Sequence, residues 1–158
     1  MINELDYSGG LAKPLIMDDN PLLREVSISV IDFDTNLIDL VKSMVATMFS
    51  NNGCGLSAIQ IGVTKRVIVA FFETKVVVMV NPVITRTLKR EIVESEGCLS
   101  IPRTKWCQVS RPAKCDVDFQ DTDGTNHSIS LSGRLARIIQ HEIDHLNGVL
   151  IYDKVYRG

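Results

Sequence analysis

Two stretches of the chain have apolar residues three or four positions apart, the spacing that places them on one face of an α-helix. The first follows Asp34, a residue type that commonly caps a helix N-terminus. Its apolar face would consist of Leu37, Leu40, Val41, Met44, Val45 and Met48. The second lies between Gly133 and Gly148, with Leu135, Ile138, Ile139, Ile143 and Leu146 at the apolar positions. The pattern therefore predicts two long helices.

The segment between these helices has the pattern of β-strands. Near-continuous apolar runs at 66–72 and 75–84 predict strands that are buried on both faces. Apolar and polar residues alternate at 113–120 and again at 127–132, with turn residues between, which predicts a hairpin. Weaker strands are expected at 88–94 and 106–110. His127 begins the second hairpin strand, and we interpret it as a structural histidine.

Length and composition narrow the class of protein. A chain of 158 residues is most simply one domain, 1–158, with a real core, and 45% hydrophobic with 23% charged residues is ordinary for a globular protein. The net charge of −2 argues against nucleic acid or an anionic membrane as the main partner. No apolar run reaches the length of a membrane span, and no signal peptide is evident. We therefore expect a cytoplasmic protein whose four cysteines are thiols.

The second predicted helix carries HEIDH, residues 141–145, which matches the H-E-x-x-H pattern of metal-dependent hydrolases. A helix advances about 100° per residue, so His141 and His145 lie one turn apart on one face, where both can bind one metal ion. Glu142 would lie close enough to act on a water at that metal without being a ligand. An ordinary helix with two surface histidines is the alternative that this pattern alone leaves open.

Two histidines do not complete a catalytic site, which commonly has three protein ligands and one open position. Downstream, Ile151 stands where one group of peptidases has a third histidine, and Asp153 is the last acid. The third ligand is therefore expected upstream. Cys98, in the shaped segment 96–102, would give a Cys-His₂ site. By spacing alone the competitors are Cys54, Cys107 and Cys115.

Three segments of the chain resemble, in order, the three motifs of peptide deformylases. They are GCGLSAIQ at 53–60, EGCLS at 96–100 and QHEIDH at 140–145, and the likeness runs from about Leu23 to Tyr152. The three together, at these separations, are highly specific. The resemblance implies an α+β fold, with mostly antiparallel sheets packed around the metal-binding helix. It also implies hydrolysis of the N-formyl group of N-formylmethionine at the N-terminus of nascent polypeptides, with release of formate.

The resemblance also assigns roles to individual residues. The metal ligands would be Cys98, His141 and His145, with Fe²⁺ as the native ion and Zn²⁺ or Ni²⁺ able to substitute. Glu142 would be the general base and then the general acid. Gln60 and the backbone N–H of Leu99 would stabilise the oxyanion.

Further roles concern the substrate and the helix. Gly55 would offer backbone hydrogen bonds to the substrate chain, and Cys54 and Ile138 would lie beside its methionine. Asp144 would be structural, paired with Arg111 in the manner of the family.

The chain departs from the family pattern in two places. Ser57 stands where the first of two alanines is usual, and the chain stops soon after the metal-binding helix. Many relatives continue into a C-terminal helix associated with ribosome docking, so only a transient ribosome association is expected here. Short forms of this kind resemble phage-encoded deformylases, which would place the protein in a host cytoplasm.

Two other functions compete with deformylation. The runner-up is a zinc endopeptidase of the H-E-x-x-H type, which Ile151 and the short downstream segment argue against. A non-enzymatic structural metal module is the other, although closed structural sites use four protein ligands and do not need Glu142. The expected partners are N-formylmethionyl peptides, without direct contact to nucleic acid or membrane.

Overall fold

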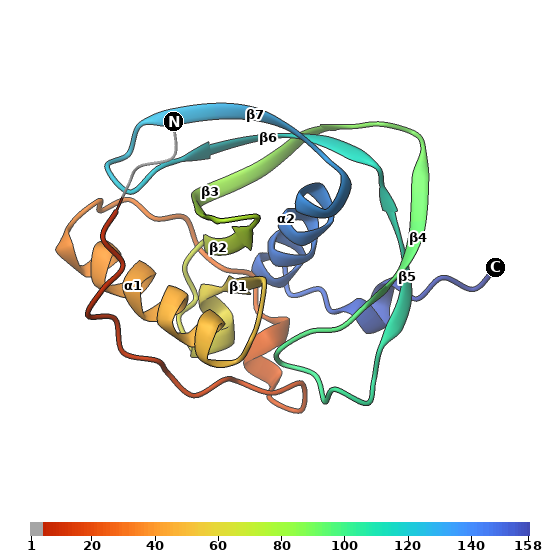
Figure 1. Cartoon of the computed structure of the whole chain (residues 1–158), viewed down its shortest axis with the longest axis horizontal. Helices are drawn as coiled ribbons and strands as arrows, with labels where there is room; N and C mark the ends of the chain where they lie inside the picture. The colour runs from red at the N-terminus through yellow and green to blue at the C-terminus, as the bar shows by residue number, and fades with distance from the viewer. Residues whose placement is uncertain (1–4) are drawn as a thin grey trace.

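A computed structural model describes residues 5–158 (Figure 1). The helices are α1 (Thr35–Ser50) and α2 (Gly133–Leu146), with short 3₁₀ helices η1 (Pro21–Arg24), η2 (Ala58–Ile61) and η3 (Ile151–Lys154). The strands are β1 (Gly55–Ser57), β2 (Val67–Phe72), β3 (Lys75–Thr87), β4 (Glu91–Glu96), β5 (Cys107–Pro112), β6 (Lys114–Gln120) and β7 (Asn126–Ser132). The strands form a five-stranded sheet, β1-β2-β3-β6-β7, and a two-stranded sheet, β4-β5, and every strand pair is antiparallel.

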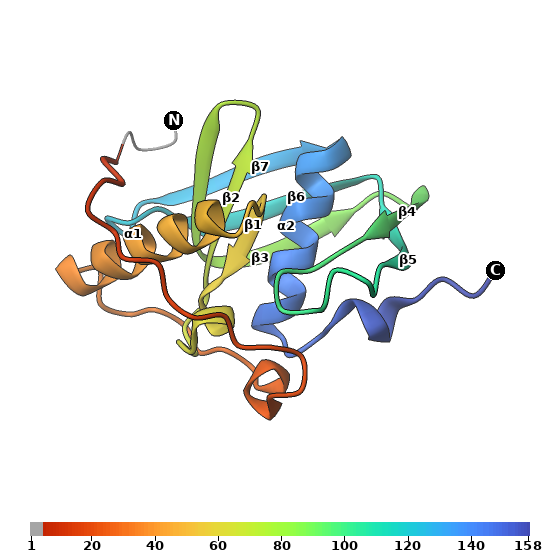
Figure 2. The same ribbon diagram turned by 60° about the horizontal axis from the view of Figure 1, so that its bottom comes forward.

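The central strands of the larger sheet are covered on both faces, which explains their continuous apolar runs. Val67 and Val69 pack in the core that α1 covers, whereas Ile68 and Ala70 pack in the core that α2 covers. Successive side chains of a strand point to opposite faces, so one apolar run supplies both cores. Figures 1 and 2 show the short strand β1 between α1 and α2.

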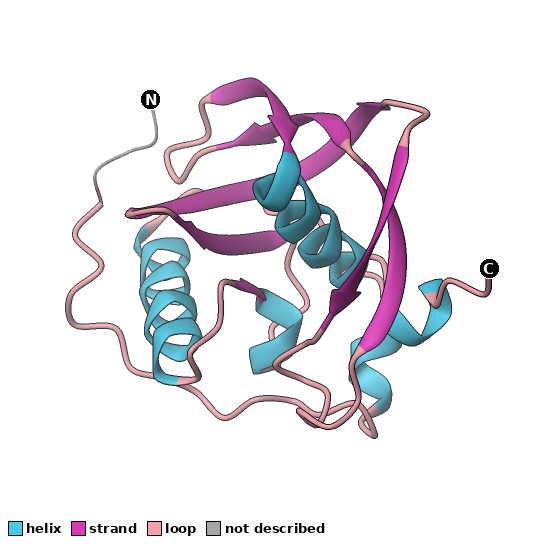
Figure 3. Ribbon diagram, turned by 45° about the vertical axis from the view of Figure 1, so that its right-hand side comes forward, coloured by secondary structure: helices cyan, strands magenta, loops and turns pink. Residues whose placement is uncertain are grey.

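The smaller sheet encloses α2 from the other side, as Figure 3 shows. Only residues 88–90 separate β3 from β4, and Ala113 alone separates β5 from β6. The chain therefore passes from the larger sheet to the smaller one between β3 and β4, and it returns to the larger sheet between β5 and β6. A small core of Ile101, Val109 and Ile151 joins β5 to η3. Helix α2, which carries the HEIDH sequence, is thus held between two antiparallel sheets, and the predicted α+β fold is confirmed.

The sequence predictions of individual elements are largely confirmed. Asp34 caps α1 and its side chain accepts a hydrogen bond from the Leu37 N–H at 3.2 Å. The hairpin is β6–β7, and His127 in it pairs with Asp121 at 2.8 Å, as a structural histidine would. The strands expected at 88–94 and 106–110 lie slightly later, at β4 and β5. The pattern did not predict β1 and η2. Within residues 5–158, no helix is long and apolar enough to span a bilayer.

A buried network of charged side chains ties the smaller sheet to α2. Glu96, at the end of β4, accepts hydrogen bonds from Arg111 of β5 at 2.6 and 2.9 Å and from Arg137 of α2 at 2.6 Å. Arg111 also donates to Asp144 of α2 at 2.8 Å, which confirms the expected pair. Arg111 is only 2% exposed, so this charge depends on its carboxylate partners.

Replacement of Asp144 by Asn should destabilise the fold without removing a metal ligand. The change takes one anion from a buried guanidinium, and because Asp144 is itself partly exposed we expect a loss of about 2 kcal/mol in the free energy of unfolding. Denaturant unfolding checks the loss, and metal analysis checks the site. Asp116→Asn is the matched control, because Asp116 pairs with a largely exposed Arg86 at 3.8 Å and such pairs contribute about 0–1 kcal/mol. Equal unfolding midpoints for the two variants would contradict the role given to Asp144.

Candidate metal centre

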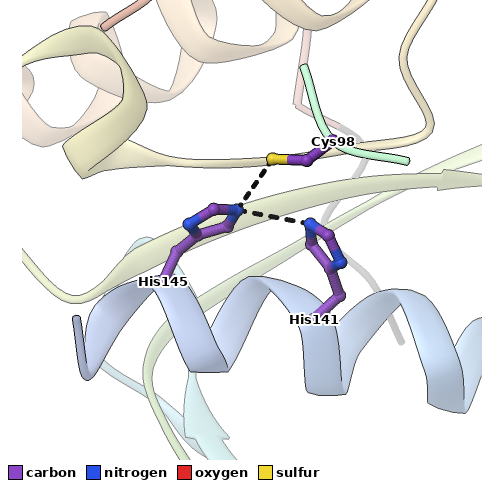
Figure 4. Close-up of side chains that lie close together, drawn as sticks. All are labelled: Cys98, His141 and His145. Carbon is purple, nitrogen blue, oxygen red and sulfur yellow. Dashed lines mark hydrogen bonds between the residues drawn. The ribbon is translucent and has the colours of Figure 1, made fainter. Parts of the chain in front are cut away.

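Helix α2 presents two imidazole rings to one point. His141 and His145 lie one turn apart, and their Nε2 atoms are 3.2 Å from each other. Figure 4 shows both rings rising from α2 on the same side, with their edges turned toward Cys98. The spacing in the sequence therefore produces the arrangement that the helical pitch requires.

Cys98 approaches the two rings from the segment that follows β4. Its Sγ lies 3.2 Å from His145 Nε2, and the ligand atoms of Cys98, His141 and His145 all lie within 4.8 Å of one another. Two backbone hydrogen bonds fix the segment that begins at Cys98, because Ile101 donates to the Cys98 carbonyl at 3.1 Å and Asp18 donates to the Ser100 carbonyl at 2.8 Å.

The three donor atoms fit a divalent metal. Two imidazole nitrogens and a thiol meet at one point, and a mixed nitrogen and sulfur donor set suits zinc and iron. Cys98 is the one cysteine in this ligand group among the described residues, although Cys54 lines the same cavity. Cys115 is buried in the core beneath α2, where burial raises the pKa of its thiol to about 11, and Cys107 begins β5. Of the four cysteines, the structure thus brings Cys98 to the histidine pair.

Glu96 orients the ring of His141. Its Oε2 lies 3.0 Å from His141 Nδ1, which leaves Nε2 facing Cys98 and His145. Burial alone would raise the pKa of the Glu96 carboxyl, but hydrogen bonds with Arg111 and His141 hold that pKa well below its usual range. Glu96 is therefore a permanent anion behind the ring, the kind of outer partner that fixes the tautomer of a metal-binding histidine.

The two histidines differ in their electrostatic surroundings. Burial lowers the pKa of His145, so its ring is neutral and its Nε2 can be a ligand. Burial also acts to lower the pKa of His141, but contacts with Cys98 and Glu96 outweigh it and raise that pKa. A metal that binds to His141 must therefore displace a proton from this ring. His145 Nδ1 has no hydrogen-bond partner within the described chain, so packing holds that ring.

Glu142 lies beside the histidines and is almost completely buried, with 4% of its surface exposed. Burial raises the pKa of its carboxyl, although the charge of His141 and a hydrogen bond from Ser57 oppose the increase. The Ser57 hydroxyl donates to Glu142 Oε2 at 2.7 Å. A carboxyl whose pKa is raised toward neutrality is suited to take up and return a proton.

The amide of Gln60 has a defined orientation. The Ser57 N–H donates to its Oε1 at 2.9 Å, and its Nε2 is 3.0 Å from Ser100 Oγ and 3.6 Å from Cys98 Sγ. The N–H end of the amide therefore faces the ligand group. The adjacent backbone N–H of Leu99 has no hydrogen-bond partner among residues 5–158.

One cavity of about 730 Å³ brings the predicted residues together. All of the predicted site residues except His145 line it: Cys54, Gly55, Gln60, Cys98, Leu99, Ile138, His141 and Glu142. His145 lies beneath the others and is 1% exposed. Arg103, Trp106 and Arg134 also line the cavity, and the sequence analysis did not find them. Trp106 is the single tryptophan of the chain, but its 60% exposure is visible only in the structure, and nothing in the pattern distinguishes the two arginines.

This arrangement is that of a mononuclear metallohydrolase: three converging nitrogen and sulfur donors, a buried carboxyl beside them and a cavity above. Comparison with known proteins identifies the family. The family model for polypeptide deformylase matches residues 12–158. The peptide deformylase of Rhizobium meliloti is 42% identical over 148 residues, which are 90% of this chain and 84% of that protein.

Solved structures of peptide deformylases are also similar to this chain. The crystal structure of peptide deformylase from Thermotoga maritima is 35% identical and superposes with a TM-score of 0.90, over 92% of this chain and 99% of that one. A class I type b peptide deformylase from Acinetobacter baumannii, crystallised with Met-Ala-Ser bound, is 31% identical with a TM-score of 0.88, over 92% of this chain and 99% of that one. The chain belongs to the polypeptide deformylase family.

Proposed function

We propose that this chain removes the formyl group from N-formylmethionine at the N-terminus of polypeptides, with a metal held by Cys98, His141 and His145. The observation that supports this function is the convergence of these three side chains, within 4.8 Å, beside the buried carboxyl of Glu142. Family membership supports the same reaction and does not favour a zinc endopeptidase. Three ligands also match a catalytic site better than a closed structural one.

A divalent metal at this site would supply Lewis acidity, lowering the pKa of a water molecule and polarising the formyl oxygen. Glu142 would take the proton of the attacking water and deliver it to the leaving amine, and its raised pKa suits both steps. The products are then formate and a free amino terminus.

Negative charge develops on the formyl oxygen during attack. The Gln60 Nε2 group and the Leu99 N–H are the donors we assign to it, because the orientation of the Gln60 amide is set before the substrate arrives. Donors fixed in advance need no rearrangement when charge appears, which is the basis of oxyanion stabilisation.

The cavity would hold the rest of the substrate. Cys54 and Ile138 form part of its apolar wall, next to Glu142, and are our candidates for contact with the methionine side chain. Gly55 would offer its backbone to the substrate chain. A β-carbon at Gly55 would lie 3.0 Å from Ile138 Cγ2 and would also crowd Glu142, so only glycine leaves this approach open. Transient ribosome association and a host cytoplasm stay predictions from the resemblance.

Formyl-Met-Ala-Ser, its N-acetyl analogue and the unblocked peptide together test the function. Formate should be released from the first peptide alone, because a cavity that accepts the single hydrogen on the formyl carbon can exclude a methyl group. Cleavage of an internal peptide bond in any of the three, without formate, would instead support the endopeptidase.

Replacement of Glu142 by Gln should lower kcat by ~10²–10⁴-fold, because the amide cannot accept and return the proton. Metal content should not change, since Glu142 is beside the ligands and not among them. Glu94→Gln is the matched control: Glu94 lines the same cavity but is largely exposed and pairs with Arg137, so its kcat should stay near that of the wild type. A Glu142 variant that keeps full activity at equal metal occupancy would contradict the assignment.

Fe²⁺ is our proposal for the native metal, and Zn²⁺ or Ni²⁺ would bind the same donors. Oxygen can oxidise both ferrous iron and the Cys98 thiolate, so iron-loaded protein should be most active without air and lose activity in air. Nickel-loaded protein should keep good activity in air, and zinc-loaded protein should be fully occupied but slow. Formate release and metal content of each form check this order. Zinc protein as active and as air-stable as nickel protein would contradict the choice of iron.

A further inference from the structure

Ser57 carries a hydroxyl at the position where the family motif usually has alanine, and that hydroxyl contacts the carboxylate of Glu142. The residue is the last of β1 and is fully buried. Its Oγ lies 2.7 Å from Glu142 Oε2 and 3.1 Å from the Glu142 backbone oxygen. A hydroxyl donates one proton, and the carboxylate is both the nearer and the stronger acceptor. The Ser57–Glu142 bond is thus a charge-assisted hydrogen bond in a buried setting.

The two oxygens of Glu142 have different surroundings. Oε2 is held by Ser57, whereas Oε1 lies against the backbone of Gly55, where a β-carbon would overlap it. Oε1 has no hydrogen-bond partner in the part of the chain that the structure describes, and Glu142 lines the cavity. One oxygen is therefore anchored, and the other is available to a water molecule or a substrate amine.

We propose that Ser57 is a positioning residue that holds Glu142 Oε2 and so presents Oε1 to the reacting groups. This inference rests on the proposed function, in which Glu142 moves the proton. A carboxylate rotates about its last bond without a strong preference, so an anchor on one oxygen restricts the position of the other. Proton transfer depends on that position, because the base must lie within hydrogen-bond reach of the proton.

The anchor is itself rigid. Ser57 pairs with Ile68 in the antiparallel β1–β2 ladder, and its N–H donates to Gln60 Oε1. The same residue therefore orients Glu142 through its side chain and Gln60 through its backbone. The two effects can be separated, because a change from serine to alanine removes the hydroxyl and leaves the N–H in place.

The test compares Ser57→Ala with the wild type in metal-loaded form, with formyl-Met-Ala-Ser as substrate. We expect kcat to fall roughly tenfold, the effect of losing one hydrogen bond to a charged group, with KM and metal content unchanged and the unfolding midpoint lowered only by the loss of one buried hydrogen bond. Ser27→Ala is the matched control: Ser27 is also a buried serine, at 3% exposure, and its hydroxyl has no partner in residues 5–158, so its kcat should not change.

A double-mutant cycle separates positioning from a general structural effect. If the hydroxyl acts through Glu142, adding Ser57→Ala to Glu142→Gln should cause no further loss of kcat, because the proton transfer it supports is already absent. An unchanged kcat in Ser57→Ala, or an equal fall in both backgrounds, would overturn the assignment. The wild type in the same assay tests the reaction itself: an inactive, fully loaded wild type overturns the proposed function together with this inference, whereas an active one isolates the result for Ser57.

Discussion

The site depends on the hydrogen bonds and ion pairs of one buried carboxylate, that of Glu96. It ends β4, and it is bound by Arg111 from β5, Arg137 from α2 and the ring of His141. Burial of such charges costs desolvation energy that their mutual attraction does not reliably recover, so a network of this kind is a poor source of stability. Its effect here is geometric. It fixes the distance between the smaller sheet and α2, and it turns His141 Nε2 toward Cys98 two residues beyond Glu96.

The layers of the fold bring the remaining groups to the same place. The larger sheet lies between α1 and α2, and β1 at its edge supplies Ser57 and Gly55 beside Glu142. The turn after β4 supplies Cys98 and Leu99 from the other sheet. These two segments converge on helix α2, and each is anchored by backbone pairing or by buried charge. Rigid anchoring of this kind is what a metal site and a proton-transfer group both require.

Local pattern was enough to predict part of this structure. The two helices, the long strands and the β6–β7 hairpin follow from apolar periodicity, and the Asp34 cap follows from its side-chain chemistry. The shared face of His141 and His145 follows from helical pitch alone. Cys98 did not follow, because its contact with His145 spans 47 residues and no spacing rule distinguishes it from the other cysteines. Resemblance to the family motifs selected it, and the structure brings that cysteine to the histidines.

The contacts around Glu142 and Glu96 could not be predicted from the sequence. Three-residue β1 is too short for a period to be visible, and η2 begins directly after it. The Ser57–Glu142 bond joins residues 85 positions apart. In the sequence, Arg137 appears as an ordinary charged residue of an amphipathic helix, and Glu96 opens the EGCLS motif without an assigned role. Only the packing of the two sheets around α2 makes them a buried pair. Contacts of this type depend on tertiary geometry, which local propensity does not encode.

The most direct test of the ligand set is the X-ray absorption spectrum of the protein loaded with zinc. Cys98, His141 and His145 predict one sulfur at about 2.3 Å and two imidazole nitrogens at about 2.0–2.1 Å, with an additional light atom in the open position. A first shell without sulfur would remove Cys98 from the site. A shell with two sulfurs would require a second cysteine, in contradiction to the group that the structure brings together.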